Sequence, residues 1–366
     1  MAVLGYAQLQ HDQLPSTWDA DEMNRVKLAA GVSFADVVAE ADTAVQEASQ
    51  AFIDDPRWAS LLAVQDDGEI KYGVGSTGGV KEITEEGVPD PKHGKTRGHQ
   101  INLKDWGDSL GWSHFGLRDR SRADLDEDIR TAVVSTTSHL QWLALTAFFR
   151  MEAVTFGSNG QTNPFADGGT ADSEYIPVTG PDGTTFASSH NHFLRQDAFS
   201  MTNFNLALYH LWEHGKNGVF DVVASSLDAS DWQGLSGFKK PTWTDLNYQQ
   251  DATVRANIAD NDMYIGYIEG DYGIARIWLS GRIPTNYWGI YKSNGALDAM
   301  NPLRMRINPN TGFGFKILPG QYVNSPSNLA VYHAQHNIGV GGDRTNGVCV
   351  YVAGSGSYVT PTISSS

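Results

Sequence analysis

Residues 121–152 read SRADLDEDIRTAVVSTTSHLQWLALTAFFRME, and this stretch decides the fold of the chain. Ser121 is a typical helix cap, and Asp124 stands at the third helical position, where a carboxylate favours the positive end of the helix dipole. We expect a helix of about thirty residues, roughly 45 Å long at ~1.5 Å per residue. One face of this helix follows the three- and four-residue spacing of a buried stripe; its members are Leu125, Ile129, Val133, Thr136, Leu140, Leu143, Ala147 and Met151.

The composition is that of a folded protein with little charge. The 366 residues are 40 % hydrophobic and include ten Trp, whereas charged residues make up only 19 %, below the usual quarter. The formal net charge of −16 argues against a simple nucleic-acid reader, because such a protein needs a clustered basic face. If DNA lies near this chain, we expect the protein to surround it and not to bind it through a basic surface.

Cysteine content and hydropathy set further bounds. Cys349 is the single cysteine, so no disulfide can form within the chain. No stretch approaches the ~20 consecutive apolar residues of a membrane span, and the N-terminus lacks the pattern of a signal peptide. We therefore expect a soluble, intracellular protein.

The region before the long helix is predicted to contain an extended arm, a helix and a hairpin. Residues 1–20 lack periodicity, and Ser33 is placed to cap a helix that runs to about Phe52. Strand-like runs at 60–65, 69–75 and 99–103 flank a Gly- and Pro-rich tip, which indicates a long two-stranded hairpin. Such a hairpin is marginal alone in water and needs another surface to lie on.

The region after the long helix alternates a few helices with many strands. A helix is expected from Thr202 to His214, where Gly215 stops it, and a short helix within 228–238. Two strands are expected to meet at Glu269-Gly270-Asp271. Further strand-like runs are VFDVVAS at 219–225, LRMRI at 303–307, FGFKIL at 313–318, NLAVYHAQHNIG at 328–339 and VCVYVAG at 348–354. The pattern predicts an α+β protein.

One motif could carry enzyme chemistry. His210, Glu213 and His214 fit H-x-x-E-H, in which two histidines bind zinc and the glutamate activates water. Gly215 follows directly and no third ligand is evident, so we favour the alternative of two polar histidines at a helix C-terminus. His190-Asn191-His192 resembles a nuclease motif without the partners that such a site needs. We expect no catalytic residue, no cofactor site, no metal site and no enzyme activity.

Taken in order, these parts resemble the major capsid proteins of tailed bacteriophages with the HK97-like fold. Residues 211–235 resemble the helix, glycine and strand of that family's axial domain, and residues 268–291 resemble its glycine-rich strand pair. PDGTTFASSHNH at 181–192 is similar to the family's D-G-x-x-L-F-S-x-x-H turn, with Thr185-Phe186-Ala187-Ser188 in place of the Leu-Phe-Ser portion.

The resemblance implies a division of the chain into the family's parts. These are an N-terminal arm with helices (1–56), an extended hairpin called the E-loop (57–118), a peripheral domain (119–200) with the spine helix (121–152), an axial domain (201–320), and a return to the peripheral and axial domains (321–366).

The resemblance also implies a function. Subunits of this family form the hexamers and pentamers of an icosahedral shell that encloses double-stranded DNA without reading its sequence. The implied location is the virion, with assembly in the host bacterial cytoplasm and no membrane. Portal and scaffolding proteins are the implied partners, with decoration proteins in some relatives.

One further detail of the family and two alternative functions have to be considered. Some relatives cross-link an E-loop lysine to a neighbour's asparagine; Lys71, Lys81, Lys92 and Lys95 are available here, and ordinary solvated lysines are the competing interpretation. The alternatives to a phage capsid are the shell of an encapsulin-type cellular compartment and a zinc-dependent hydrolase that uses His210, Glu213 and His214.

Overall fold

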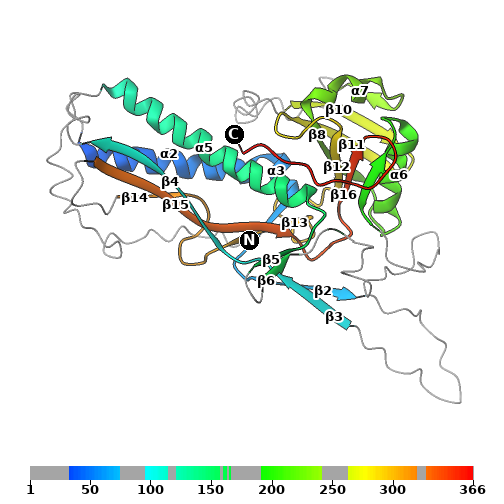
Figure 1. Cartoon of the computed structure of the whole chain (residues 1–366), viewed down its shortest axis with the longest axis horizontal. Helices are drawn as coiled ribbons and strands as arrows, with labels where there is room; N and C mark the ends of the chain where they lie inside the picture. Colours follow the sequence, from blue (N-terminus) through cyan, green and yellow to red (C-terminus); the bar gives the residue numbers. More distant parts are fainter. Residues whose placement is uncertain are drawn as a thin grey trace, which may run out of the picture.

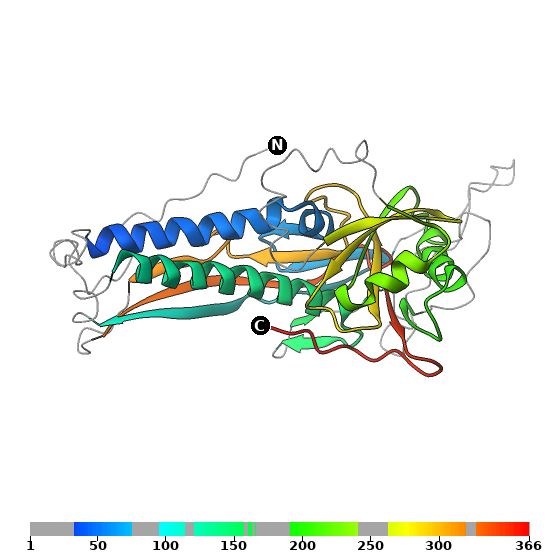
Figure 2. The same cartoon turned by 90° about the horizontal axis from the view of Figure 1, so that it is seen from above.

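The described part of the chain forms an elongated molecule with two large β-sheets, two small two-stranded sheets and one long helix that reaches from one large sheet to the other (Figures 1 and 2). The computed structural model describes residues 33–74, 95–113, 121–156, 160–162, 165, 191–240, 263–319 and 327–365. The expected arm at 1–20, most of the hairpin tip and most of the turn at 181–192 lie outside the described residues. Within the described part, no helix combines the length and hydropathy needed to cross a membrane.

The described part of the chain contains both helices and strands, in agreement with the predicted α+β class. The helices are α2 (Phe34–Asp54), α3 (Pro56–Leu61), α5 (Arg122–Phe149), α6 (Met201–Trp212), α7 (Ala229–Gly234) and the short 3₁₀ helix η3 (Ser226–Asp228). The strands are β1 (Leu62–Gln65), β2 (Glu69–Val74), β3 (Lys95–Gln100), β4 (Lys104–Ser113), β5 (Val154–Phe156), β6 (Gly160–Thr162), β7 (Phe193–Gln196), β8 (Val219–Ser225), β9 (Phe238–Lys239), β10 (Met263–Gly270), β11 (Gly273–Ser280), β12 (Tyr287–Lys292), β13 (Leu303–Ile307), β14 (Lys316–Pro319), β15 (Ser327–Val340) and β16 (Val348–Val352).

Helix α5 confirms the expected spine. Ser121 caps it by accepting a hydrogen bond from the backbone N–H of Asp124, whose side chain in turn accepts from Ser121, so both halves of a capping box are present. The helix ends at Phe149, slightly before the expected 152, because Arg150 adopts an extended backbone. Its first half buries one stripe, whereas from Leu140 to Phe149 it is buried on nearly every side.

Helix α2 lies alongside the first half of α5 (Figures 1 and 2). Ser33 and Asp36 form a capping box at its start, as the sequence predicts. A small core fills the space between the two helices and the sheet beneath them; it contains Val37, Val38, Ala41, Val45, Leu125, Ile129, Ala132, Phe315, Ile317, Tyr332 and Ala334.

The five-stranded sheet under these helices is organised around β15. One edge of β15 pairs with β4 over residues 327–336, and its other edge pairs with β14 and then β13, all antiparallel. Strand β1 adds to β13 in parallel. The sequence did not predict β4, since KDWGDSLGWS is rich in Gly and Asp and reads as a loop.

The seven-stranded sheet is compact and has the order β7-β16-β12-β8-β11-β10-β9. The expected pair around Gly270 is confirmed, because β10 and β11 are antiparallel neighbours joined there. Helix α6 covers this sheet, and Gly215 ends it in the left-handed region at φ +77° as expected. Residues 201–320, which the resemblance implies to be the axial domain, contribute strands to both large sheets, because β13 and β14 belong to the five-stranded one. The domain boundaries implied by the resemblance stay a prediction.

One hydrophobic core is shared by both sheets. The C-terminal turns of α5 supply Leu143, Phe148 and Phe149, which meet Met305 of the five-stranded sheet and Tyr291 of the seven-stranded sheet in one cluster. The edge of the Phe148 ring lies against β12 at Gly289, where a Cβ would lie 2.2 Å from its Cε1 atom. Position 289 must therefore be glycine for the helix to approach this closely.

We expect Gly289→Ala to destabilise the protein by roughly 1–3 kcal/mol, because Phe148 is held by neighbouring aromatic rings and cannot move aside. Gly234→Ala is the matched control, since a Cβ there meets nothing within 4 Å, and it should change stability by less than about 0.5 kcal/mol. Urea unfolding measures both. Equal stability of the two variants would show that the contact is not tight.

Candidate functional site

Three features of the described chain could serve a function: the β2–β3 hairpin, a buried polar junction between the two sheets, and a histidine cluster at the end of α6. The hairpin is a separate two-stranded sheet that points away from the body (Figure 1). Its pairing runs from Glu69↔Gln100 to Val74↔Lys95. A two-stranded excursion is confirmed here, but its second strand is 95–100 and not the expected 99–103. The strand-like run at 60–65 supplies β1, which pairs with β13 in the five-stranded sheet.

The base of the hairpin is fixed to the five-stranded sheet. Ile70 and Ile101 are buried there, and Arg306 donates a hydrogen bond of 2.8 Å from Nη1 to the carbonyl of Ile101. His99 is also buried, and its Nε2–H donates to the carbonyl of Val340 over 2.7 Å. The hairpin thus leaves the body from a rigid base.

Burial lowers the pKa of His99 to about 4; the hydrogen bond to Val340 acts in the opposite direction, and the charge of Arg344 lowers the pKa further. His99 is therefore neutral at pH 7. Of the four lysines named for cross-linking, Lys71 is exposed beside Glu69, with 3.2 Å between Nζ and Oε2. Lys81 and Lys92 lie outside the described residues, and only the backbone of Lys95 is described.

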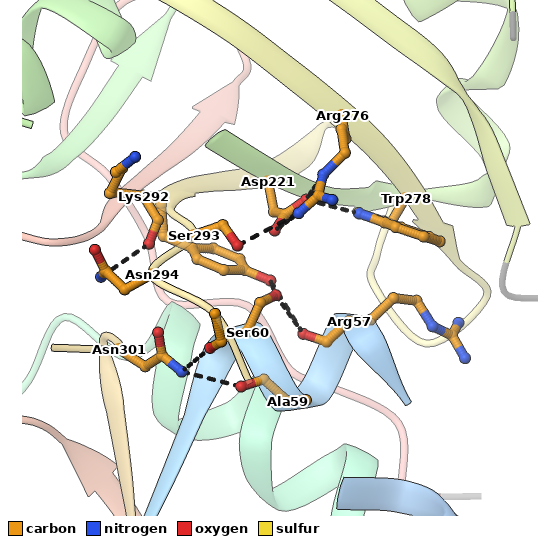
Figure 3. Close-up of polar contacts among 12 residues, drawn as sticks. Arg57, Ala59, Ser60, Asp221, Arg276, Trp278, Lys292, Ser293, Asn294 and Asn301 are labelled. Atoms are coloured by element: carbon orange, nitrogen blue, oxygen red, sulfur yellow. Dashed lines mark hydrogen bonds and ion pairs between the residues drawn. The ribbon is translucent and has the colours of Figure 1, made fainter. Parts of the chain in front are cut away.

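The junction between the sheets is a buried hydrogen-bond network (Figure 3). Asp221 of β8 is fully buried, and its two carboxylate oxygens accept from Nε and Nη2 of Arg276, both at 2.7 Å. The Nε1–H of Trp278 donates to the same carboxylate over 3.0 Å. Three donors therefore satisfy this buried carboxylate.

Helix α3 is held against this network by a tyrosine and an asparagine. The Tyr291 hydroxyl donates to the carbonyl of Arg57 and lies 3.1 Å from the Ser60 hydroxyl. Complete burial raises the pKa of Tyr291 well above its usual value, so the hydroxyl stays protonated. The side-chain amide of Asn301 donates to the carbonyls of Ala59 and Leu62, each at 2.9 Å (Figure 3 shows the Ala59 contact). The network joins the two sheets as one body.

The H-x-x-E-H motif does not form the arrangement of a continuous zinc helix. Helix α6 ends at Trp212, Glu213 is its C-cap, and His214 stands in the turn that follows. His210 instead lies 3.0 Å from Glu213, between Nδ1 and Oε1. His214 lies 3.0 Å from His192, between the two Nε2 atoms.

The structure therefore brings together residues of two motifs, His-Asn-His and H-x-x-E-H. Neither motif was predicted to form a functional site. His192 comes from the His-Asn-His run, and its ligand atom lies within 4.8 Å of those of His210 and Glu213. Sequence reasoning missed this because nothing in the spacing between 192 and 210 indicates a contact. The only signal in the sequence was that His192, His210, Glu213 and His214 lie within one short region.

Comparison with known proteins agrees with this architecture. No protein-family model and no curated protein matches the chain. A solved chain from Mycobacterium phage Patience matches with a TM-score of 0.60 and 18 % identity, over 95 % of this chain and 96 % of that one. A chain of the bacteriophage PhiM1 mature capsid has a TM-score of 0.44 and 10 % identity, over 81 % of this chain and 87 % of that one. A chain of the holo-SrpI encapsulin complex from Synechococcus elongatus has 0.42 and 8 %, over 84 % and 91 %.

The first match extends over nearly the whole of both chains, and it shows that the two chains share one α+β fold. More specifically, this is the HK97-like fold. The fold expected from the sequence resemblance is confirmed.

We expect acidification to weaken the hairpin base through His99. The folded pKa is about 4 and the usual value is 6.5, so the unfolded chain takes up a proton first, and stability present above pH 6.5 is lost as the pH falls toward 4. At pH 5 the loss from this residue is roughly 2 kcal/mol. His99→Gln keeps an N–H donor for Val340 without titrating. Urea unfolding at pH 7 and pH 5 should show a smaller loss in the variant, and equal losses would contradict the prediction.

We expect Asp221→Asn to destabilise the protein by about 3 kcal/mol, because it leaves Arg276 without its buried counter-charge. Lys239→Gln is the control: it breaks the Lys239–Glu269 ion pair, in which both side chains are about half exposed, and should cost ~0–1 kcal/mol. Thermal or urea unfolding compares the two. A cost for Asp221→Asn no greater than for Lys239→Gln would show that the junction does not depend on this charge pair.

Proposed function

We propose that this chain is the major capsid protein of a tailed double-stranded DNA bacteriophage and that its copies form an icosahedral shell around the genome. The observation that carries the proposal is the β2–β3 hairpin, which is anchored at its base and extends from the body as a two-stranded sheet. Two strands alone are marginal in water, and a neighbouring subunit supplies the surface that they need.

The HK97-like fold and the spine give this hairpin a place in a shell. In such an assembly each copy uses the same surfaces as every other, so one hairpin contact is repeated around each ring of subunits. The rigid junction at Asp221 and Tyr291 supports this role, because a shell subunit must transmit contacts made by one sheet to the other.

Exposed apolar surface on the compact part supports contacts between subunits as well. Leu227 in η3 has 76 % of its surface exposed, and Val219 and Ile274 are neighbours in the β8–β11 pairing and are both exposed. Single exposed apolar residues are ordinary, but these lie on the part that the resemblance assigns to the symmetry axes. They are the candidate contacts of hexamers and pentamers.

The charge supports enclosure of DNA rather than specific binding. With a net charge of −16, the chain does not present the excess of positive charge that phosphate neutralisation uses. Portal and scaffolding proteins, with decoration proteins on the outside, are the partners of this role. The virion is the corresponding location, and the host bacterial cytoplasm is the site of assembly. Shell building itself needs no catalytic residue or cofactor.

Purified protein is expected to form shells or capsomer-like rings that negative-stain electron microscopy can detect. Particles from the source should contain double-stranded DNA. A strictly monodisperse monomer under every assembly condition would contradict the proposal. Particles that contain a co-purified enzyme instead of DNA would favour the encapsulin-type compartment.

We expect residues 66–98 to be cut by trypsin in free subunits and protected in assembled particles, because a neighbour covers the hairpin only after assembly. Mass spectrometry of the fragments locates the cuts after Lys71, Lys81, Lys92, Lys95 and Arg97. Lys239, exposed on the compact sheet, serves as a reference site in the same digest. Equal cleavage of 66–98 in subunits and particles would show that no neighbour covers the hairpin.

A further inference from the structure

We propose that His192, His210 and Glu213 form a binding site for a divalent transition-metal ion of the Zn²⁺ type, with His214 as the candidate fourth ligand. Two imidazoles and a carboxylate are ligands that zinc uses in proteins. Their ligand atoms all lie within 4.8 Å of one another, although the residues come from the segment before β7, from α6 and from the C-cap of α6. This inference is independent of shell assembly.

The distances suit one ion. Zinc–nitrogen and zinc–oxygen bonds of ~2.0–2.2 Å place two ligands of a tetrahedral ion roughly 3.4 Å apart. His210 Nδ1 and Glu213 Oε1 are 3.0 Å apart, and His192 Nε2 and His214 Nε2 are 3.0 Å apart. Each of these two pairs would have to separate by about 0.4 Å to place its atoms on one tetrahedral ion.

His192 is oriented as a metal ligand by its surroundings. It is completely buried, and the backbone N–H of Cys349 donates to its carbonyl over 2.9 Å. Its Nδ1 lies 2.8 Å from the carbonyl of Gly347, which can only accept, so Nδ1 carries the proton. In the neutral ring the lone pair is therefore on Nε2, which faces the cluster. A backbone carbonyl that fixes the other ring nitrogen is the usual support of a metal-binding histidine.

The carbonyl that holds His192 is itself fixed. A Cβ on Gly347 would lie 2.7 Å from the ring of the buried Phe165, so the backbone at 347 rests directly on that ring. The same turn carries Asp343, which forms an ion pair with Lys216 just after α6. This pairing neutralises the nearby lysine, which would otherwise repel a cation.

Glu213 supplies an electrostatic reason for a cation. Its carboxylate is nearly buried at the C-terminal end of α6, where the helix dipole is negative. The carboxylate and the helix end together favour a cation at this position. A divalent ion supplies positive charge there and binds both imidazoles in their neutral form.

The arrangement indicates a structural ion and not the catalytic ion of an H-x-x-E-H hydrolase. In such a hydrolase the glutamate activates water while both histidines of the helix bind the metal. Here Glu213 lies among the ligands, and the helix ends between His210 and His214. The ion would join the segment before β7 to the end of α6, two parts of the compact region that are distant in sequence.

The test uses the full-length, tag-free protein, because a histidine tag would bind zinc itself. Subunits are stripped with EDTA, dialysed and titrated with Zn²⁺, and bound zinc is measured by mass spectrometry. Co²⁺ replaces Zn²⁺ in a parallel titration that reports tetrahedral coordination by visible absorption. We expect one ion per chain and a higher melting temperature with Zn²⁺.

Glu213→Gln is the main variant because it keeps the shape of the side chain, and His210→Ala is the second because His210 is partly exposed. Each should weaken Zn²⁺ binding at least ~10-fold. His333→Ala is the control, since His333 pairs with Asp105 in the five-stranded sheet, and it should bind like the unmodified chain. Absence of stoichiometric metal, or binding that both site variants retain as well as the control does, would overturn the proposal.

Discussion

The packing of Phe148 against the bare backbone of Gly289 is the contact on which the arrangement of the molecule depends. It lets the end of α5 enter the space between the two sheets, so that residues of both contribute to one core. Around it, polar groups that would be costly to bury are paired: Asp221 with Arg276, Tyr291 with the carbonyl of Arg57, and Asn301 with the start of β1. The two sheets consequently behave as parts of a single folding unit.

The sequence predicts the elements whose signals are local. Ser121 and Ser33 are predicted as helix N-caps, and in the structure each forms a complete capping box. Gly215, predicted to stop a helix, lies just after the end of α6 in the left-handed region. β12 and β4 were not predicted as strands. Strand β12 (YWGIYK) carries a glycine that only the approach of Phe148 explains, and β4 is held by pairing with β15, more than 200 residues away. Propensity cannot report a partner at that distance.

The same reason limits prediction of the candidate metal centre. The H-x-x-E-H spacing implied a pair of histidines one turn apart, but the helix ends at Trp212 and separates them. His192 is placed by the turn at Gly347, so its position depends on contacts with residues 155 positions further along the chain. No spacing rule could have related these two segments. The ligand types were visible in the sequence, and their geometry was not.

Strand β15 has a consequence for the time at which the protein can fold. It is the central strand of the five-stranded sheet, and it pairs with β4, β13 and β14, yet it is the last of these strands to leave the ribosome. Strands β1 and β4 are made more than 200 residues earlier and have no complete sheet to join until then. Strand β16 has the same position between β7 and β12 in the other sheet. Completion of both sheets therefore waits until β15 and β16 have been made, so it depends on contacts between residues distant in sequence.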